Sequence, residues 1–268
     1  MIKAAVLGSP IEHSLSPLLH NRAYEILGIP ASYHAIDLTP DSALDFFERA
    51  LQEDWTGFSL TMPLKESIFD LVSDIEFLIE PIALRMRSAN TLIKEGSRYS
   101  AFSTDRTGFQ RLLAPISRER VAIIGGGGTA RAALAAIDSE GVEIDFLLRS
   151  PHRALTLSTI AVHSTVNFYT MDHSLDGYDL VISTVPTGAS DAIAKNLNFK
   201  IPCLFEVLYK PFPTPLLAKA RSLGVHTFDG MDLLVEQALD QIAAFADRSF
   251  DYDEMRRELQ IVGRRALI

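Results

Sequence analysis

The chain has 268 residues, a hydrophobic fraction of 47%, a charged fraction of 22% and a formal net charge of −9. This length and composition are typical of a folded protein with one large domain or two ordinary ones. The negative charge argues against a nucleic-acid partner, because no basic stripe is available to neutralise phosphates. No apolar run approaches the length of a membrane span and no signal peptide is indicated, so we expect a cytoplasmic protein without a membrane partner.

The single cysteine, Cys203, excludes a disulfide framework and a cysteine-based metal site. It lies in the apolar run 201–205, where a small buried hydrophobic residue is a better interpretation than a nucleophile. We therefore expect no metal cofactor.

The first hundred residues alternate short apolar strands with helices. Strands are predicted at residues 3–7, 32–36 and 57–62, and helices at 18–27, 41–52 and from about 65. A hairpin around a glycine-containing turn, with strands at 88–94 and 98–102, leads into a helix at 106–113.

Two serines precede the first helix. Ser16 stands before Pro17, and a serine cap followed by proline at the first helical position is a favoured helix start. Helix capping is therefore a sufficient reason for a serine at position 16, and no function is needed to explain it. Capping does not explain Ser14, two residues earlier.

Three further polar residues have both a structural and a functional interpretation. Lys65 opposes the dipole of the helix it begins, which is typical of functional sites, although a solvated lysine tolerates this small cost equally well. Capping of the helix at 106–113 is the structural interpretation of Asp105, and it is the commoner use of such a residue. Asn90 is also consistent with a local turn.

From Arg120 onward the chain repeats strand–helix units. Apolar strands are predicted at residues 121–124, 144–148, 166–169, 180–183, 203–207 and 225–228. Because these strands alternate with helices, we expect a parallel sheet that is covered on both faces. Two tail helices, at about 230–247 and 251–265, have apolar faces that we expect to pack on the first domain.

The strand at 121–124 runs into four glycines and then into an alanine-rich helix. Gly125, Gly127 and Ala130 match the Gly-x-Gly-x-x-Ala dinucleotide fingerprint in its strand–turn–helix context. Glycine allows the tight turn and the close approach of backbone N–H groups to a pyrophosphate. A glycine turn that only lets the helix pack against the strand is the alternative interpretation.

The next strand ends in a basic segment. Dehydrogenases that bind an unphosphorylated cofactor usually carry an acid here for the ribose hydroxyl. This chain has Arg149, Ser150 and Arg153 instead, which suit a 2′-phosphate and predict NADP. A solvated basic loop is the alternative, which the missing acid weakens.

Six motifs in the correct order resemble those of the shikimate dehydrogenase family, and they span nearly the whole chain. They lie at residues 8–17 (GSPIEHSLSP), 60–65 (LTMPLK), 89–92 (ANTL), 104–108 (TDRTG), 209–217 (YKPFPTPLL) and 230–238 (GMDLLVEQA). Several motifs together are far more specific than the glycine loop alone.

The resemblance implies an enzyme that reversibly reduces 3-dehydroshikimate to shikimate with NADPH, in the pathway to chorismate and the aromatic amino acids. It implies that Lys65 is the acid/base residue and that Asp105 is its partner. The residues implied to hold the substrate are Ser14, Ser16, Thr61, Asn90, Asp105, Tyr209 and Gln237. Those implied to hold the cofactor are Gly125, Gly126, Gly127, Gly128, Thr129, Arg149, Ser150 and Arg153, with Val207 and Gly230 near the nicotinamide.

The chain departs from the family pattern at several positions. Ser59 and Ser103 stand where the family commonly has asparagine, and Arg87 stands at a usual glycine. Residues 148–150 read Leu-Arg-Ser in place of Asn-Arg-Thr, and Glu206 replaces an aspartate. These changes bear on fine substrate preference more than on the type of reaction.

We therefore expect an α/β protein with an α/β substrate domain at residues 1–105, completed by C-terminal helices at 237–268. A Rossmann-type doubly wound NADP-binding domain is expected at 106–236, with the active site between the two domains at the carboxyl ends of parallel strands. The partner is a small-molecule substrate, and the protein is expected to be a monomer or homodimer.

Two alternatives remain open at this point. One is a quinate/shikimate dehydrogenase with NAD or mixed cofactor use, and serine at position 16 favours shikimate over quinate. The other is a non-catalytic nucleotide-binding regulator of the same fold. The retained Lys65 and Asp105 argue against such a regulator, since a binding protein does not need the pair.

Overall fold

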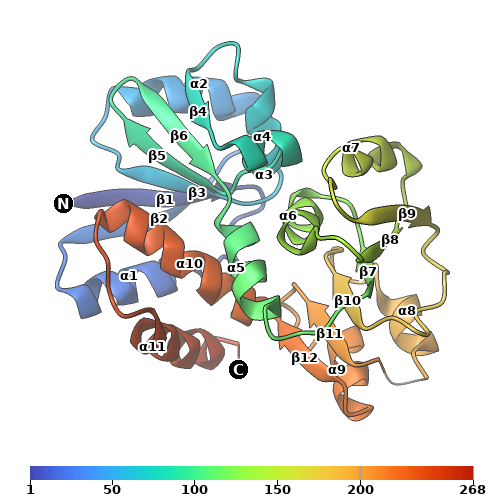
Figure 1. Cartoon of the computed structure of the whole chain (residues 1–268). Coiled ribbons are helices and arrows are strands. Elements are labelled where there is room, and N and C mark those ends of the chain that lie inside the picture. Colours follow the sequence, from blue (N-terminus) through green and yellow to red (C-terminus); the bar gives the residue numbers. More distant parts are fainter. Residues whose placement is uncertain (199–200, 268) are drawn as a thin grey trace. The chain divides into compact units, whose positions relative to one another are not determined.

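The computed structural model describes residues 1–198 and 201–267; Phe199, Lys200 and Ile268, which the expected domain ranges include, lie outside the described residues. The chain forms two compact units (Figure 1). Unit 1 contains Met1–Thr107 and Leu234–Ala266, and unit 2 consists mainly of Gly108–Leu233. None of the helices in the described ranges has the length and apolarity that a membrane span requires.

Unit 1 carries the first six strands, and the unit boundaries fall inside α5 and α10. Its elements are β1 (Ile2–Gly8), α1 (Ser16–Leu27), β2 (Ala31–Asp37), α2 (Pro40–Leu51), β3 (Gly57–Leu60), α3 (Leu64–Ser67), η1 (Ile68–Asp70), β4 (Phe77–Ile79), α4 (Pro81–Met86), β5 (Thr91–Glu95), β6 (Arg98–Phe102), α5 (Thr104–Leu113), α10 (Gly230–Ala246) and α11 (Tyr252–Arg265).

The sheet of unit 1 has the strand order β2-β1-β3-β5-β6-β4. β1 is parallel to β2 and β3, whereas β5 is antiparallel to β3 and β6. Leu7 of β1 is in register with Leu60 of β3, and Thr91 of β5 is in register with Ser59 of β3 and Phe102 of β6. The carboxyl ends of β1, β3 and β6 therefore meet the start of β5 at one edge of the sheet.

Aromatic side chains fill much of the core on this sheet. Phe47 of α2, Phe58 of β3 and Tyr99 of β6 are fully buried, and their ring centroids lie 5.5–6.1 Å apart. Tilted and edge-to-face pairs of this kind add to the free energy gained from burying the rings. The packing fixes α2 on the strands whose ends carry the polar residues described below.

Unit 2 continues the strand–helix alternation that the sequence predicts. Its elements are β7 (Arg120–Ile124), α6 (Gly128–Ile137), β8 (Glu143–Leu147), η2 (Pro151–Arg153), α7 (Ala154–Ser158), β9 (Thr165–Tyr169), β10 (Leu180–Ser183), α8 (Asp191–Asn196), β11 (Cys203–Glu206), α9 (Pro215–Ser222) and β12 (His226–Asp229).

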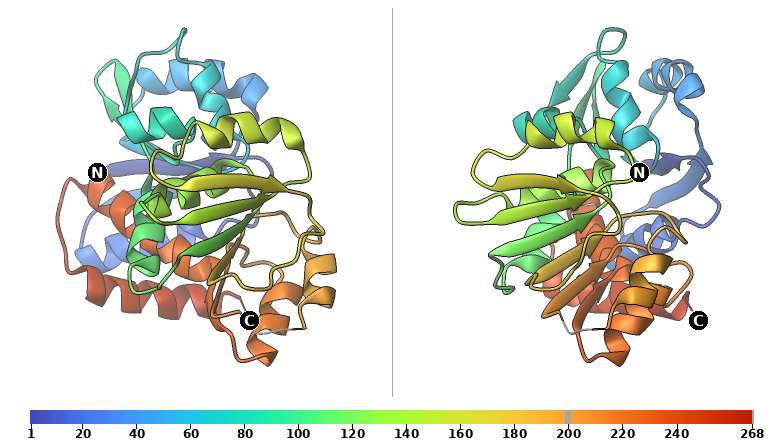
Figure 2. Two further views of the ribbon diagram at one scale, coloured as in Figure 1. Left: turned by 45° about the vertical axis from the view of Figure 1, so that its right-hand side comes forward. Right: turned by 90° about the vertical axis from the view of Figure 1, so that its right-hand side faces the viewer.

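The sheet of unit 2 has the strand order β12-β11-β10-β7-β8-β9, and each neighbouring pair is parallel. This is the strand order of a Rossmann fold, so the predicted α/β class with a Rossmann-type sheet is confirmed. The strands lie side by side in both views of Figure 2. Because they are parallel, their carboxyl ends all lie along one edge of the sheet.

Apolar burial explains why these strands form. Val121 and Ile124 of β7 are fully buried, and Ile124, Val181, Leu204 and Leu216 belong to one core cluster. Cys203 is 2% exposed and burial raises the pKa of its thiol to about 11, which confirms its interpretation as a buried hydrophobic residue.

The predicted cap at Ser16 is wrong. α1 begins at Ser16 itself, with Leu15 as the N-cap, because the backbone of Leu15 is already helical and its carbonyl accepts from Leu19 N at 3.2 Å. Ser14 Oγ accepts a hydrogen bond from Ser16 N at 3.3 Å. Ser14, the serine that capping left unexplained, therefore orders the start of this helix.

The structural interpretation of Asp105 as a helix cap is also wrong. Asp105 is the second residue of α5, and Ser103 Oγ accepts the hydrogen bond from Arg106 N at 3.4 Å. A serine at the usual asparagine position therefore satisfies a donor of the first turn of α5. This leaves the carboxylate of Asp105 available for another partner.

Arg87 ends α4 in the left-handed conformation, with φ of 45° and ψ of 47°. Glycine is favoured after a helix in this conformation because a Cβ atom introduces strain. The exposed Arg87 guanidinium lies 3.3 Å from Asp70 and 5.9 Å from the centre of the Phe69 ring. The side chain therefore covers the surface of η1, and the backbone conformation accounts for the usual glycine.

We expect Arg87→Gly to raise the free energy of unfolding by about 1 kcal/mol, because glycine relieves the left-handed strain. Arg87→Ala is the matched control, since it removes the same exposed ion pair, which contributes little, and retains the strain. Urea denaturation of the three proteins measures the difference. Equal stability of the glycine and alanine variants would contradict this account.

Candidate active site

The edge of the first sheet collects polar residues from four strands. Ser14 and Ser16 follow β1, Lys65 follows β3, Asn90 immediately precedes β5, and Asp105 follows β6. Since these strand ends meet in register, residues distant in sequence come together. α10 adds Gln237 to the same group through a hydrogen bond to Asn90.

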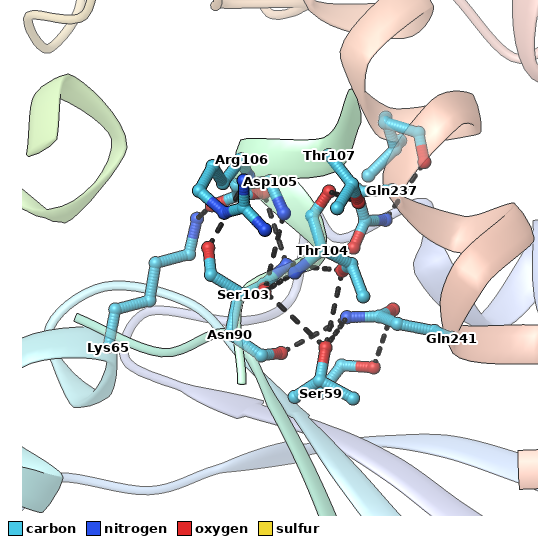
Figure 3. Close-up of polar contacts among 12 residues, drawn as sticks. Ser59, Lys65, Asn90, Ser103, Thr104, Asp105, Arg106, Thr107, Gln237 and Gln241 are labelled. Carbon is cyan, nitrogen blue, oxygen red and sulfur yellow. Dashed lines mark hydrogen bonds and ion pairs between the residues drawn. The ribbon is translucent and has the colours of Figure 1, made fainter. Parts of the chain in front are cut away.

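Lys65 and Asp105 form a close ion pair. Lys65 Nζ lies 2.6 Å from Asp105 Oδ2, and the two side chains are 16% and 7% exposed (Figure 3). Charges that are largely removed from water attract more strongly than an exposed pair. The solvated-lysine interpretation is therefore wrong, and the dipole argument is weak because α3 contains only four residues.

The side-chain amide of Asn90 holds Asp105 from a second side. Asn90 Nδ2 donates to Asp105 Oδ1 at 3.1 Å, to Thr104 Oγ1 at 2.9 Å and to Gln237 Oε1 at 3.3 Å. Asn90 Oδ1 accepts from the backbone N–H of Thr104 at 2.7 Å and of Asp105 at 3.4 Å. The amide thus fixes both the first turn of α5 and one oxygen of the carboxylate.

Thr61 lies at the end of β3, where the chain passes close to the end of β1. Thr61 N donates to Leu7 O at 2.9 Å, and a Cβ atom at Gly8 would lie only 2.7 Å from Met62 O. Glycine is therefore required at position 8 for this approach. The backbone carbonyl of Thr61 also accepts from Lys65 N at 3.3 Å, which ties Thr61 to the start of α3.

Hydrogen bonds connect some of the expected substrate residues with one another, but not all of them. Lys65, Asn90, Asp105 and Gln237 share one continuous hydrogen-bond network. Ser14 and Ser16, which follow β1 in the chain, are bonded to each other, with Ser16 N donating to Ser14 Oγ. Tyr209 belongs to unit 2, in the connection between β11 and α9.

Gln241 of α10 is a residue that the sequence reasoning missed. Its Nε2 donates to Asn90 O and to Thr91 Oγ1, each at 3.0 Å, and its Oε1 accepts from Ser59 Oγ at 2.8 Å. Gln241 is fully buried. It stands on the apolar face of α10 with Ala238 and Ile242, and a polar residue at such a position is the signal that could have found it.

Ser59 and His20 complete this inner network. Tyr33 donates its hydroxyl proton to Ser59 Oγ at 2.7 Å, and His20 Nε2 lies 3.2 Å from Gln241 Oε1. Burial lowers the pKa of His20 to about 3, so its imidazole is neutral and Nε2 donates to the amide oxygen. The serine at the usual asparagine position is thus satisfied by Tyr33 and Gln241.

The edge of the second sheet carries the glycine loop. Gly125 follows β7 with φ of 106°, and a Cβ atom there would lie 2.6 Å from Thr184 Oγ1. Gly127 is the N-cap of α6, whose first residue is Gly128, followed by Thr129. A backbone N–H cluster at the start of a ten-residue helix, next to the point where the strand order reverses, suits a pyrophosphate.

The segment after β8 lies against this loop. Arg153 Nη1 donates to Gly126 O at 2.9 Å, and a Cβ atom at Gly126 would lie 3.1 Å from Arg153 Cδ. Arg149 is exposed, and Ser150 is the N-cap of η2. The Arg153 guanidinium at the glycine loop, with Arg149 and Ser150 in the same segment, fits a cofactor with a 2′-phosphate.

Two further expected cofactor residues, Val207 and Gly230, approach each other closely. A Cβ atom at Gly230 would contact Val207 O, and it would lie 2.6 Å from Leu208 C. Gly230 therefore lets the start of α10 pass against the connection that follows β11. The carboxylate of Glu206, at the end of β11, is fully buried beneath the same connection.

A Rossmann-type sheet with a glycine-rich turn, in one chain with a buried lysine–aspartate pair, is typical of two-domain α/β dehydrogenases. Comparison with known proteins gives the particular family. Residues 6–92 match the family model described as the shikimate dehydrogenase substrate binding domain. Shikimate dehydrogenase (NADP(+)) of Bacillus cereus AH187 is 30% identical over 269 residues, covering 94% of this chain and 95% of the relative. The chain belongs to the shikimate dehydrogenase family.

Solved structures agree with this assignment. The crystal structure of Mycobacterium tuberculosis shikimate dehydrogenase has a TM-score of 0.86 and 30% identity, and it covers 97% of this chain and 100% of its own. Shikimate 5-dehydrogenase from Thermus thermophilus, in complex with NADP(H) and shikimate, has a TM-score of 0.82 and 26% identity, with 98% and 100% coverage.

We expect Gln241→Leu to lower the free energy of unfolding by about 3 kcal/mol, because Asn90 O, Thr91 and Ser59 lose a buried hydrogen-bond partner. Gln52→Leu makes the same chemical change at an exposed position and is expected to alter stability by less than about 0.5 kcal/mol. Guanidinium denaturation compares the two variants, and similar values for both would contradict the role of the Gln241 amide.

Proposed function

We propose that this protein is an NADP-dependent shikimate dehydrogenase, which reversibly reduces 3-dehydroshikimate to shikimate in the pathway to the aromatic amino acids. The observation that carries the proposal is the Lys65–Asp105 pair, held by Asn90 at the edge of the first sheet. The shikimate and NADP(H) bound to the Thermus thermophilus relative support the choice of ligands.

Lys65 is the acid/base residue in this proposal. Bound NADPH supplies the hydride that reaches the substrate's carbonyl carbon. As negative charge develops on the carbonyl oxygen, Lys65 Nζ stabilises it and donates a proton to it. Asp105 Oδ2, 2.6 Å from Nζ, orients the ammonium group and keeps it at the reacting oxygen. In the reverse direction, the neutral amine accepts the hydroxyl proton.

The substrate is held by short polar side chains on a rigid sheet edge. A ring that carries several hydroxyls and a carboxylate needs donors and acceptors at fixed positions. The set proposed to supply them comprises Ser14, Ser16, Thr61, Asn90, Asp105, Gln237 and, from unit 2, Tyr209. Because the Asn90 amide and the first turn of α5 order each other, this edge is formed before the substrate binds.

The cofactor is held by unit 2. Gly125–Thr129 would receive the pyrophosphate at the N-terminus of α6, and Arg149, Ser150 and Arg153 would receive the 2′-phosphate. Val207 and Gly230 would flank the nicotinamide. Residues 1–105 with 237–268 thus form the proposed substrate domain, and residues 106–236 form the proposed NADP domain.

Initial rates of shikimate and quinate oxidation with NADP and with NAD test the proposal directly. We expect shikimate with NADP to give the highest kcat/KM, because the segment after β8 lacks an acid for a free ribose hydroxyl and carries Arg149 and Arg153. Quinate oxidised as efficiently as shikimate would identify a quinate/shikimate dehydrogenase. Turnover with neither substrate would favour a nucleotide-binding regulator of the same fold.

Lys65→Ala is expected to lower kcat by about 10²–10⁴-fold, the typical contribution of a positioned acid/base group. Shikimate still binds, because the other proposed binding residues remain, and calorimetry measures its affinity. Lys94→Ala removes a lysine from β5 of the same sheet and is expected to leave kcat unchanged. Near-normal turnover of Lys65→Ala would refute the proposed role.

A further inference from the structure

We propose that Glu206 is a positioning residue for the connection that carries Val207 and Tyr209, and that its ionised carboxylate is the form that holds this connection in place. The inference rests on the proposed function, in which Val207 lies near the nicotinamide and Tyr209 near the substrate. Glu206 itself is fully buried and therefore acts through its neighbours rather than by touching either ligand.

One carboxylate links the two ends of the connection at 207–214. Glu206 Oε1 accepts from Leu208 N at 3.4 Å, and Glu206 Oε2 accepts from Thr214 Oγ1 at 3.3 Å. Thr214 is also the N-cap of α9, where its Oγ1 accepts from Leu217 N at 3.1 Å. The carboxylate thereby ties the segment that carries Tyr209 to the end of β11 and to the start of α9.

A second contact limits the movement of the same segment. Gly230, at the start of α10, allows the backbone of Val207 and Leu208 to approach so closely that a Cβ atom would lie 2.6 Å from Leu208 C. The backbone at 207–208 is therefore held by Glu206 through a hydrogen bond and by Gly230 through direct contact. Loss of the hydrogen bond releases one of these two restraints.

The groups that face Glu206 do not compensate its charge. In register on the neighbouring strands are the neutral Ser183 of β10 and the acidic Asp229 of β12. Arg221 of α9 pairs with Asp229 at 2.9 Å, and no ion pair of Glu206 occurs in residues 1–198 and 201–267. Burial raises the pKa of Glu206 to about 7, so its charge changes in the neutral pH range.

Protonation weakens the hold that the Glu206 carboxylate has on the connection. The ionised group accepts at both oxygens, which is what Leu208 N–H and Thr214 O–H require. A proton on Oε1 faces Leu208 N–H, which cannot accept, whereas a proton on Oε2 reverses the bond to Thr214 Oγ1 and takes away the acceptor of that buried hydroxyl proton. The carboxylate consequently holds the connection more firmly above pH 7 than below it.

The ratio of wild-type to Glu206→Gln kcat/KM for shikimate, measured with NADP from pH 6 to 8, tests the inference. Glutamine offers one acceptor oxygen at every pH, as the protonated acid does. We expect the wild type to be about tenfold more active than the variant at pH 8 and within about twofold of it at pH 6, because the ionised fraction rises from about one tenth to nine tenths. A ratio of kcat/KM values that does not change with pH would contradict the inference, because it would show that the charge of Glu206 does not matter for activity.

Asp145→Asn is the matched control. Asp145 is a buried acid of β8 in the same sheet, bonded to Tyr178 OH at 2.5 Å and to Asn167 Nδ2 at 2.8 Å. Because this variant keeps Glu206, the ratio of wild-type to Asp145→Asn kcat/KM is expected to be constant with pH. Thr214→Ser keeps the hydroxyl and the wild-type profile, whereas Thr214→Val removes one restraint and is expected to resemble Glu206→Gln.

A readout that does not need turnover separates this inference from the proposed function. We expect the Leu208 amide resonance of the wild type to titrate near pH 7 and not to titrate in Glu206→Gln. An enzyme inactive toward shikimate that still shows this titration would contradict the proposed function and support the role of Glu206. A Leu208 resonance that is unchanged between pH 5.5 and 8.5 would overturn the role of Glu206.

Discussion

The geometry of the site in unit 1 depends on the side-chain amide of Asn90. Its oxygen accepts from the first N–H groups of α5, and its nitrogen donates to the carboxylate of Asp105. The amide has only one satisfactory orientation. If it were rotated by half a turn, its NH2 group would face the N–H groups of α5 and its oxygen would face the Asp105 carboxylate. Hydrogen bonds to a charged group contribute about 1.5–3 kcal/mol each, so this arrangement fixes the position of Asp105 and, through the ion pair, that of Lys65.

A second layer behind Asn90 keeps the amide in place. Gln241 donates to the Asn90 carbonyl, which also accepts from Leu60 N at 2.8 Å, and Ser59 with Tyr33 fixes the direction of the Gln241 amide. These residues stand on strands and on α10 rather than on loops. A site whose supporting groups are themselves locked by packing and hydrogen bonds holds its geometry without the substrate. The serine at position 59 therefore changes the support of the site rather than its surface.

The parts of the structure that were predictable from the sequence are those with local causes. The strands of unit 2 lie within a residue or two of their predicted bounds, and burial on both faces gives the central strands β7 and β10 nearly continuous apolar runs. The three-residue strand β4 and the six-residue helix α4 carry too few residues for a period and were missed. The contact between Lys65 and Asp105 joins residues 40 positions apart, so only the family resemblance indicated it. Ser16 was misassigned as the cap of α1, because the sequence does not show at which residue the first helical turn begins.

Two buried acids of this chain differ in how their charge is balanced. Asp105 has an ammonium group at 2.6 Å and the Asn90 amide on its other oxygen, whereas Glu206 has only neutral donors. The pKa of Glu206 is raised from 4.5 to about 7, so the folded state binds more protons than the unfolded state between these values. The free energy of unfolding therefore falls as pH rises through this window, by about 3 kcal/mol in total. The ionised form that ties down the connection at 207–214 is thus the less stable form of the fold. Burial without a cation therefore gives the end of β11 a group whose charge changes in the neutral pH range, at a cost in stability.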